Sequence, residues 1–129
     1  MRPLRVGIDL VAADEVAESI AQHGERYLSR TYTEAELMEC GGDPVRLALH
    51  FAAKEAVLKA LEPEDTGIPW TSIGILGTAP PGQPEVVLTG AAAEVAGRRG
   101  ITEVMLSFTQ TRGCVAAVAM VLADRGSRG

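Results

Sequence analysis

One stretch of the chain, residues 51–61, constrains the fold more than any other. Its sequence, FAAKEAVLKAL, is typical of a helix that is apolar on nearly every side, and such a helix is normally buried. The stretch also carries Glu55 and Lys59 one helical turn apart, so both side chains lie on one face. A buried carboxylate needs a cationic partner or a metal ion. The pair is therefore either an ordinary i,i+4 surface ion pair or part of a functional site.

The same helix carries a second polar stripe. Arg46, His50 and Lys54 recur every four residues, so they lie on a face different from that of Glu55 and Lys59. Charged faces of helices usually contact solvent. We expect this stripe to be solvated.

The remaining pattern predicts an α+β fold with an antiparallel sheet and one long buried helix. Strands are expected over 4–11, 72–77, 85–88, 103–109 and 114–122, and helices over 13–22, from Thr33, from 44 to about 63, and over 90–99. Thr33 and Glu36 form a T-x-x-E capping box. Thr111-Arg112-Gly113 indicates a hairpin between the last two strands. We expect strands to pair with their neighbours in the sequence, with the helices set apart from them.

Length and composition indicate one domain over residues 1–123, followed by a flexible tail over 124–129. The chain has 129 residues, of which 47% are hydrophobic and only 4% aromatic, and its net charge is −5. Few aromatic rings and a negative charge argue against a nucleic-acid partner. No apolar run reaches the roughly 18 residues of a membrane span. Cys40 and Cys114 lack metal-ligand spacing, so we expect free thiols in a cytoplasmic protein.

A second carboxylate interrupts an apolar strand near the N-terminus. Asp9 lies within the sequence VGIDLV, where its charge is costly unless a cation meets it. Gly7, two residues earlier, leaves room for a backbone or a ligand to approach closely. If the fold brings Asp9 and Glu55 together, two carboxylates with oxygen-only ligation suit Mg²⁺.

Four short motifs occur in a recognisable order. They are Gly7-Ile8-Asp9, residues 51–56 (FAAKEA) followed by Lys59, residues 82–84 (GQP), and residues 107–109 (SFT). Together they resemble the holo-[acyl-carrier-protein] synthase family of 4′-phosphopantetheinyl transferases, and the match spans nearly the whole chain.

The resemblance implies a homotrimer with active sites between neighbouring subunits. It implies a Mg²⁺-dependent enzyme that transfers the phosphopantetheine arm of coenzyme A to a serine of an acyl carrier protein, in fatty acid or polyketide biosynthesis. Asp9 and Glu55 would bind Mg²⁺, and Lys59 would neutralise the pyrophosphate of coenzyme A. Glu55 or a metal-bound water would take the serine proton. Further residues implied to contact coenzyme A are Gly82, Gln83, Pro84, Thr109 and Gln110.

The chain departs from the family pattern at positions that are usually cationic. Where the family usually has arginine, arginine, lysine and histidine, this sequence has Glu15, His50, Gln83 and Gln110. These changes lower the positive potential available to phosphates and to an acidic carrier protein. Arg26 and Arg30 are alternative sources of a carrier contact. Two hypotheses follow: a phosphopantetheinyl transferase, or a diverged homologue that is a scaffold or partner, or that uses other acyl substrates in a polyketide-type pathway.

Overall fold

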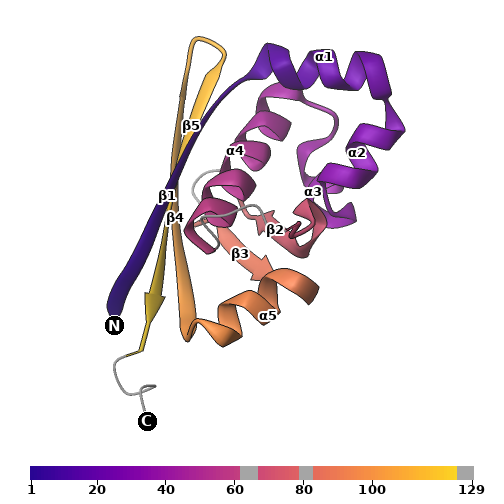
Figure 1. Cartoon of the computed structure of the whole chain (residues 1–129). Coiled ribbons are helices and arrows are strands. Elements are labelled where there is room, and N and C mark those ends of the chain that lie inside the picture. Colours follow the sequence, from indigo (N-terminus) through magenta and orange to yellow (C-terminus); the bar gives the residue numbers. More distant parts are fainter. Residues whose placement is uncertain (62–66, 79–82, 125–129) are drawn as a thin grey trace.

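The computed structural model describes residues 1–61, 67–78 and 83–124 (Figure 1). Its elements in chain order are β1 (Arg2–Ala12), α1 (Ala13–His23), α2 (Glu25–Thr31), α3 (Glu34–Cys40), α4 (Pro44–Leu61), the 3₁₀ turn η1 (Trp70–Ser72), β2 (Ile73–Leu76), β3 (Glu85–Leu88), α5 (Gly90–Arg98), β4 (Ile101–Thr111) and β5 (Cys114–Ala123). The expected α+β class is confirmed. Within these residues no helix is both long and apolar enough to span a membrane.

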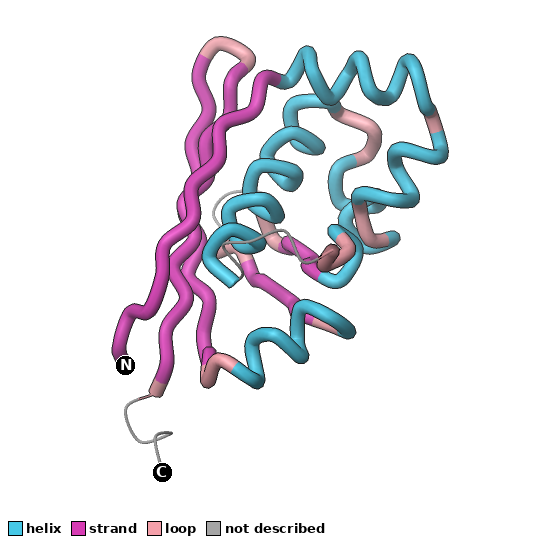
Figure 2. Tube along the Cα trace, in the orientation of Figure 1, coloured by secondary structure: helices cyan, strands magenta, loops and turns pink. Residues whose placement is uncertain are grey.

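The described strands form two antiparallel sheets. The larger has the order β1-β5-β4, and the smaller pairs β2 with β3. Pairing between sequence neighbours is confirmed for β2–β3 and for β4–β5. It is wrong for β1, which pairs with β5 from Arg2↔Ala123 to Ala12↔Cys114. The chain leaves β1 through a series of helices rather than a tight turn, so its partner β5 comes from the far end of the chain (Figure 2).

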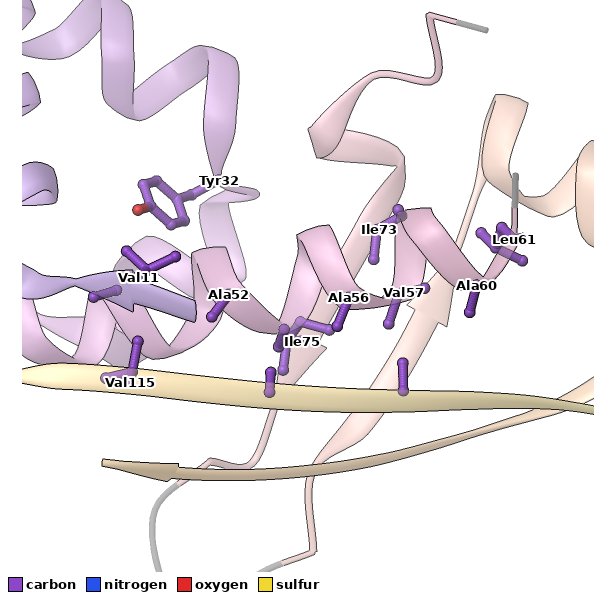
Figure 3. Close-up of a cluster of buried hydrophobic side chains, with 14 of the residues drawn as sticks. Val11, Tyr32, Ala52, Ala56, Val57, Ala60, Leu61, Ile73, Ile75 and Val115 are labelled. Atoms are coloured by element: carbon purple, nitrogen blue, oxygen red, sulfur yellow. The ribbon is translucent and has the colours of Figure 1, made fainter. Parts of the chain in front are cut away.

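Helix α4 covers one face of the larger sheet and forms the centre of the core (Figure 1). Its small residues Ala52, Ala56 and Ala60 are fully buried and lie on the side that faces the sheet (Figure 3). The opposing residues of β5 are also small or β-branched: Val115, Ala117, Ala119 and Val121. Small side chains on both surfaces let the helix approach the strands closely. The long buried helix expected from the sequence is confirmed.

The opposite face of the same sheet is apolar but exposed. Val6, Ile8 and Leu10 of β1 are 56%, 63% and 72% exposed. These three residues pair with β5 residues 120, 118 and 116, respectively. Met105 of β4 pairs with residue 120 from the other side, so it lies beside Val6 on the same face of the sheet. Soluble chains seldom leave a continuous apolar face of this kind uncovered.

Candidate functional site

A lysine–aspartate contact joins α4 to the edge strand β1. Lys59 Nζ lies 2.9 Å from Asp9 Oδ1 and donates a second hydrogen bond, of 3.0 Å, to the carbonyl of Ile8. Asp9 is mostly buried, whereas Lys59 is about half exposed. The fold thus brings together two residues, fifty positions apart, that the sequence placed in one site. The cation that meets the strand carboxylate is Lys59.

Gly7 sets the spacing between β1 and α4 at this point. A Cβ on Gly7 would lie 2.0 Å from the Ala56 carbonyl oxygen and 2.8 Å from the Ala60 nitrogen. Glu55 and Lys59 each precede one of these alanines, so both leave the helix on the same side of the contact with β1. Glu55 is partly buried and Lys59 is exposed. Lys59 therefore contacts Asp9 at the edge of the sheet, and Glu55 lies one turn before Lys59 on the same face of α4; these three residues are the candidate site.

The donor set of this site fits Mg²⁺ only with help from other molecules. Asp9 and Glu55 offer carboxylate oxygens, the ligands that Mg²⁺ prefers. Among the described residues there is no group of three or more His, Cys, Asp or Glu side chains that could hold a metal ion. Water and substrate oxygens would have to complete an octahedral shell, as is common for Mg²⁺ at phosphates.

The other residues that the resemblance implied lie elsewhere in the single chain. Thr109 and Gln110 are on β4, and β5 separates β4 from β1, so about 10 Å lies between the two edge strands. Thr109 pairs with Ala116 of β5, and its side chain lies on the exposed face of the sheet. Gln83 and Pro84 precede β3 in the smaller sheet, and Gly82 lies outside the described residues. Within one chain, Lys59 contacts Asp9, whereas Thr109 and Gln110 lie on the opposite edge strand of the sheet.

The expected solvated stripe on α4 is wrong. His50 and Lys54 are fully buried, and Arg46 is half-buried. Lys54 Nζ donates to Glu36 Oε1 at 2.5 Å and also to the carbonyl of Ile73. His50 Nδ1 lies 2.9 Å from Glu36 Oε2. The stripe faces α3 and β2 instead of water, because the buried carboxylate of Glu36 contacts both His50 and Lys54.

A second carboxylate extends this network to the loop after β2. Glu39 accepts hydrogen bonds from the Gly77 N–H at 2.8 Å, from the Thr78 N–H at 3.0 Å and from the Thr78 hydroxyl at 2.8 Å. Its Oε2 also lies 3.3 Å from His50 Nε2. Since His50 is enclosed between Glu36 and Glu39, it does not offer its ring to a surface ligand. The histidine that replaces the usual arginine is therefore an internal structural residue.

The network shifts the pKa values of its members. Burial by itself raises the pKa of Glu36, but the hydrogen bond from His50 and the charge of Lys54 outweigh it and hold the pKa below the usual value. Burial lowers the pKa of Lys54, and Glu36 opposes that shift. For Glu39, burial is outweighed by the Gly77 and Thr78 hydrogen bonds, which lower the pKa to about 2. Both carboxylates are thus held ionised.

A pocket of about 360 Å³ lies away from the candidate site, among α1, α2, α4 and η1. Its lining includes three aromatic residues and three basic ones: Tyr27, Phe51, Trp70, His23, Arg26 and Arg30. The Phe51 and Trp70 rings pack with centroids 5.6 Å apart. The pocket was not predicted from the sequence, because α2, which supplies half of these residues, was not among the expected helices. An apolar group beside an anion fits such a lining.

Comparison with known proteins agrees with the fold. The sequence model of the 4′-phosphopantetheinyl transferase superfamily matches residues 5–109, which include Asp9, Glu55 and Lys59. The chain is 38% identical over 128 residues to the holo-[acyl-carrier-protein] synthase of Desulforudis audaxviator, a match that covers 97% of both chains.

Solved structures extend this likeness to three dimensions. The crystal structure of holo-[acyl-carrier-protein] synthase from Neisseria meningitidis superimposes with a TM-score of 0.80 at 31% identity, covering 92% of this chain and 97% of that one. The Helicobacter pylori holo-[acyl-carrier-protein] synthase in complex with coenzyme A shares the fold, with a TM-score of 0.79 at 24% identity over 91% of this chain and 99% of that one. By sequence and by fold, the chain belongs to the 4′-phosphopantetheinyl transferase superfamily, among the holo-[acyl-carrier-protein] synthases.

Proposed function

We propose that this protein transfers the 4′-phosphopantetheine arm of coenzyme A to a serine of an acyl carrier protein, with Mg²⁺ as cofactor. The observation that carries the proposal is the contact of Lys59 with Asp9 between α4 and β1, with Glu55 one turn away on α4. A compact set of two carboxylates and one ammonium group suits a reaction at a pyrophosphate, which asks the protein mainly for positioning and charge stabilisation.

Each residue of the site has a role in this reaction. Asp9 and Glu55 would hold the metal, and Lys59 would neutralise a pyrophosphate oxygen of coenzyme A. Mg²⁺ bound there would supply further charge neutralisation on the pyrophosphate. Glu55, or a water held beside it, takes the proton of the carrier serine as the serine oxygen bonds to the β-phosphorus. The bond from that phosphorus to the bridging oxygen breaks, and adenosine 3′,5′-bisphosphate leaves.

The active assembly is a homotrimer. Two observations support it: the exposed apolar face of the β1-β5-β4 sheet, and the position of the remaining coenzyme A contacts outside the candidate site. A neighbouring copy packed against this face can bring its own β4, with Thr109 and Gln110, to the candidate site. Gln83, Pro84 and Gly82 complete the coenzyme A site in this arrangement. A head-to-tail contact between two different surfaces of identical copies closes into a ring of this kind.

The direct test is the mass of several apo-acyl-carrier proteins after incubation with the protein, coenzyme A and Mg²⁺. We expect a gain equal to the phosphopantetheine arm in at least one carrier, and no gain when the metal is chelated. No gain with any carrier, together with no coenzyme A binding by calorimetry, would overturn the proposal.

Replacing Glu55 tests the site itself. Glu55→Gln removes a metal ligand and the proton acceptor, so we expect transfer to fall by about 100-fold or more. The oligomeric state should remain as in the wild type, because the exposed sheet face is unchanged. Glu94→Gln, at an exposed position of α5, is the matched control and should retain full activity. Unchanged turnover in the Glu55 variant would remove this residue from the site.

One observation favours the second hypothesis, a homologue without this activity. Glu15 is exposed on α1, where an acidic carrier would be repelled. Coenzyme A binding without transfer to any carrier is the result that would select this hypothesis. A cytoplasmic location and a role in fatty acid or polyketide biosynthesis stay predictions from the sequence.

A further inference from the structure

Glu39 is a carboxylate of α3 whose hydrogen bonds reach a distant part of the chain. It accepts from the Gly77 N–H at 2.8 Å, and from the N–H and the hydroxyl of Thr78 at 3.0 Å and 2.8 Å. Its side chain is 21% exposed, so water competes little for these bonds. Gly77 and Thr78 directly follow β2. Glu39 therefore holds the start of the β2–β3 connection against α3.

The smaller sheet alone would hold this connection only loosely. Strands β2 and β3 have four residues each, and a pair of short strands is marginally stable by itself. Their register ends at Leu76↔Glu85, so the N–H groups of Gly77 and Thr78 lie beyond the ladder. Gly77 has a φ of +73°, which turns the chain at this point. The carboxylate of Glu39 supplies the acceptors that these two N–H groups need.

The far end of the connection lies close to the near end. A Cβ on Gly77 would lie 3.3 Å from the carbonyl oxygen of Gln83. Gln83 and Pro84 lead into β3, and both belong to the proposed coenzyme A site; Gln83 is exposed. Because Gly77 and Gln83 are this close, a displacement of Gly77 would also move Gln83.

The negative charge of Glu39 is compensated within the protein. Its Oε2 lies 3.3 Å from His50 Nε2, which also lies 3.1 Å from the Thr78 hydroxyl. An uncompensated carboxylate would repel the phosphates of a nearby ligand. A carboxylate that accepts three hydrogen bonds and lies beside a histidine repels them less. Glu39 thus suits the support of a ligand-binding segment better than direct contact with the ligand.

We infer that Glu39 is a positioning residue for coenzyme A. By holding Gly77 and Thr78 it fixes the place of Gln83, whose side-chain amide donates a hydrogen bond to a phosphate oxygen of coenzyme A. The inference rests on the proposed function, since it takes coenzyme A as the ligand. Glu39 acts on the affinity for coenzyme A and not on the chemical step, which belongs to the candidate site on β1 and α4.

Calorimetry of coenzyme A binding in the presence of Mg²⁺ is the first test. We expect Glu39→Ala to raise the dissociation constant about tenfold, because the segment that binds the ligand loses its support. Glu39→Gln keeps one acceptor oxygen and should raise it only about threefold. Glu34→Ala is the matched control, because Glu34 is exposed in the first turn of the same helix. It should bind coenzyme A like the wild type.

A double-variant cycle tests whether Glu39 acts through Gln83. We expect Gln83→Ala alone to weaken binding about fivefold, and the variant with both changes to bind about as weakly as Glu39→Ala, because the two residues serve one contact. Independent residues would give effects that multiply. Multiplying effects, or a dissociation constant for Glu39→Ala equal to that of the wild type, would overturn the inference.

Steady-state kinetics separates positioning from a general loss of structure. In Glu39→Ala the KM for coenzyme A should rise about tenfold, while kcat and the KM for the carrier protein stay within about twofold of the wild type. A variant that had only lost stability would keep the wild-type KM at temperatures where it is folded, and circular dichroism melts identify those temperatures. If Glu39→Ala does not fold, the threefold effect of Glu39→Gln decides the question.

Binding and transfer can fail separately. Coenzyme A binding that depends on Glu39, without transfer to any carrier, would contradict the proposed function and support the positioning role. Transfer with an unchanged KM for coenzyme A in Glu39→Ala would support the proposed function and overturn the inference. No coenzyme A binding by the wild type would overturn both.

Discussion

Glu36 shows how a single carboxylate connects three elements. Its Oε1 accepts from the Thr33 N–H at 3.0 Å, which closes the capping box of α3, and from Lys54 Nζ at 2.5 Å. Its Oε2 lies 2.9 Å from His50 Nδ1 and accepts from the Ile75 N–H at 3.3 Å. A buried charge with this many partners is fully compensated. Replacing Glu36 by an apolar residue would leave the buried Lys54 without its carboxylate, and a buried charge that loses its partner typically costs about 3–5 kcal/mol.

At Glu39, the depressed pKa makes stability depend on pH. The pKa falls from 4.5 to about 2 on folding, so the ionised carboxylate stabilises the fold fully above about pH 4.5. This contribution is lost as the pH falls toward 2. Glu39→Gln lacks it, so the difference between wild type and variant in free energy of unfolding should shrink between pH 4.5 and pH 2. Urea unfolding across this range measures the difference.

The control for this experiment is Glu34→Gln. Glu34 is exposed in the first turn of the same helix, away from the loop that binds Glu39. We expect its difference from the wild type to stay nearly constant with pH. A constant difference for Glu39→Gln as well would show that the loop contacts do not depend on ionisation.

Single residues also show where sequence reasoning stops. The four-residue spacing of Arg46, His50 and Lys54 correctly placed them along one face of α4. It could not show what that face contacts, because the compensating Glu36 lies 18 residues away from Lys54 and belongs to another helix. The capping box was correctly expected, yet the second role of Glu36 depends entirely on tertiary packing.

Among the elements, the contact of β1 with α4 is the one most sensitive to substitution. Gly7→Ala would place a methyl group 2.0 Å from a backbone oxygen that cannot rotate away. The strand and helix must separate, so we expect a loss of about 2 kcal/mol or more in the free energy of unfolding. The same separation should lengthen the contact of Lys59 with Asp9. Urea unfolding measures the first effect.

Gly74→Ala is a matched control within the other sheet. A Cβ there meets its nearest atom at 3.7 Å, which is ordinary van der Waals contact, and Gly74 is likewise buried. We expect this variant to stay within about 1 kcal/mol of the wild type. Equal losses in the two variants would mean that burial, and not the close approach, makes Gly7 necessary.

Elements with strong local signals were predictable from the sequence. The hairpin of β4 and β5 turns at Arg112 and Gly113, both with positive φ, as Thr111-Arg112-Gly113 indicated. Helix α4 also lies where the apolar stretch placed it. Helix α2 is only seven residues long, too short for an apolar period to show. The pairing of β1 with β5 has no local signal at all, because it joins the two ends of the described chain.

For the whole molecule, the exposed sheet face predicts assembly. Ile8→Lys would put a charge in the middle of that face, and burying it between copies is costly. We expect the wild type to sediment as a trimer and Ile8→Lys to sediment as a monomer at micromolar concentration. Analytical ultracentrifugation measures both.

Met38→Lys is the control for assembly, because Met38 is 86% exposed on α3 and lies away from the sheet face. It should sediment like the wild type. A monomeric wild type, or an Ile8 variant that stays trimeric, would contradict the proposed assembly.

The candidate site was likewise only partly predictable from the sequence. The sequence predicted that Asp9 and Lys59 share a site, and in the structure Lys59 Nζ lies 2.9 Å from Asp9 Oδ1. The metal, the role of Glu55 and the contacts of Gln83 and Gln110 stay predictions. Spacing along a chain identifies residues that share a helix face or a strand. It gives no information about residues that a second copy would bring.

The position of β5 has a consequence for biosynthesis. It is the last described strand along the chain and also the middle strand of the larger sheet. Until the ribosome has made β5, β1 and β4 lack the strand with which both pair. The apolar face of α4 that packs on the sheet is then only partly covered. The nascent chain must therefore hold β1 and α4 in a partly open state until β5 emerges. Chaperone contact and aggregation are most to be expected in that interval.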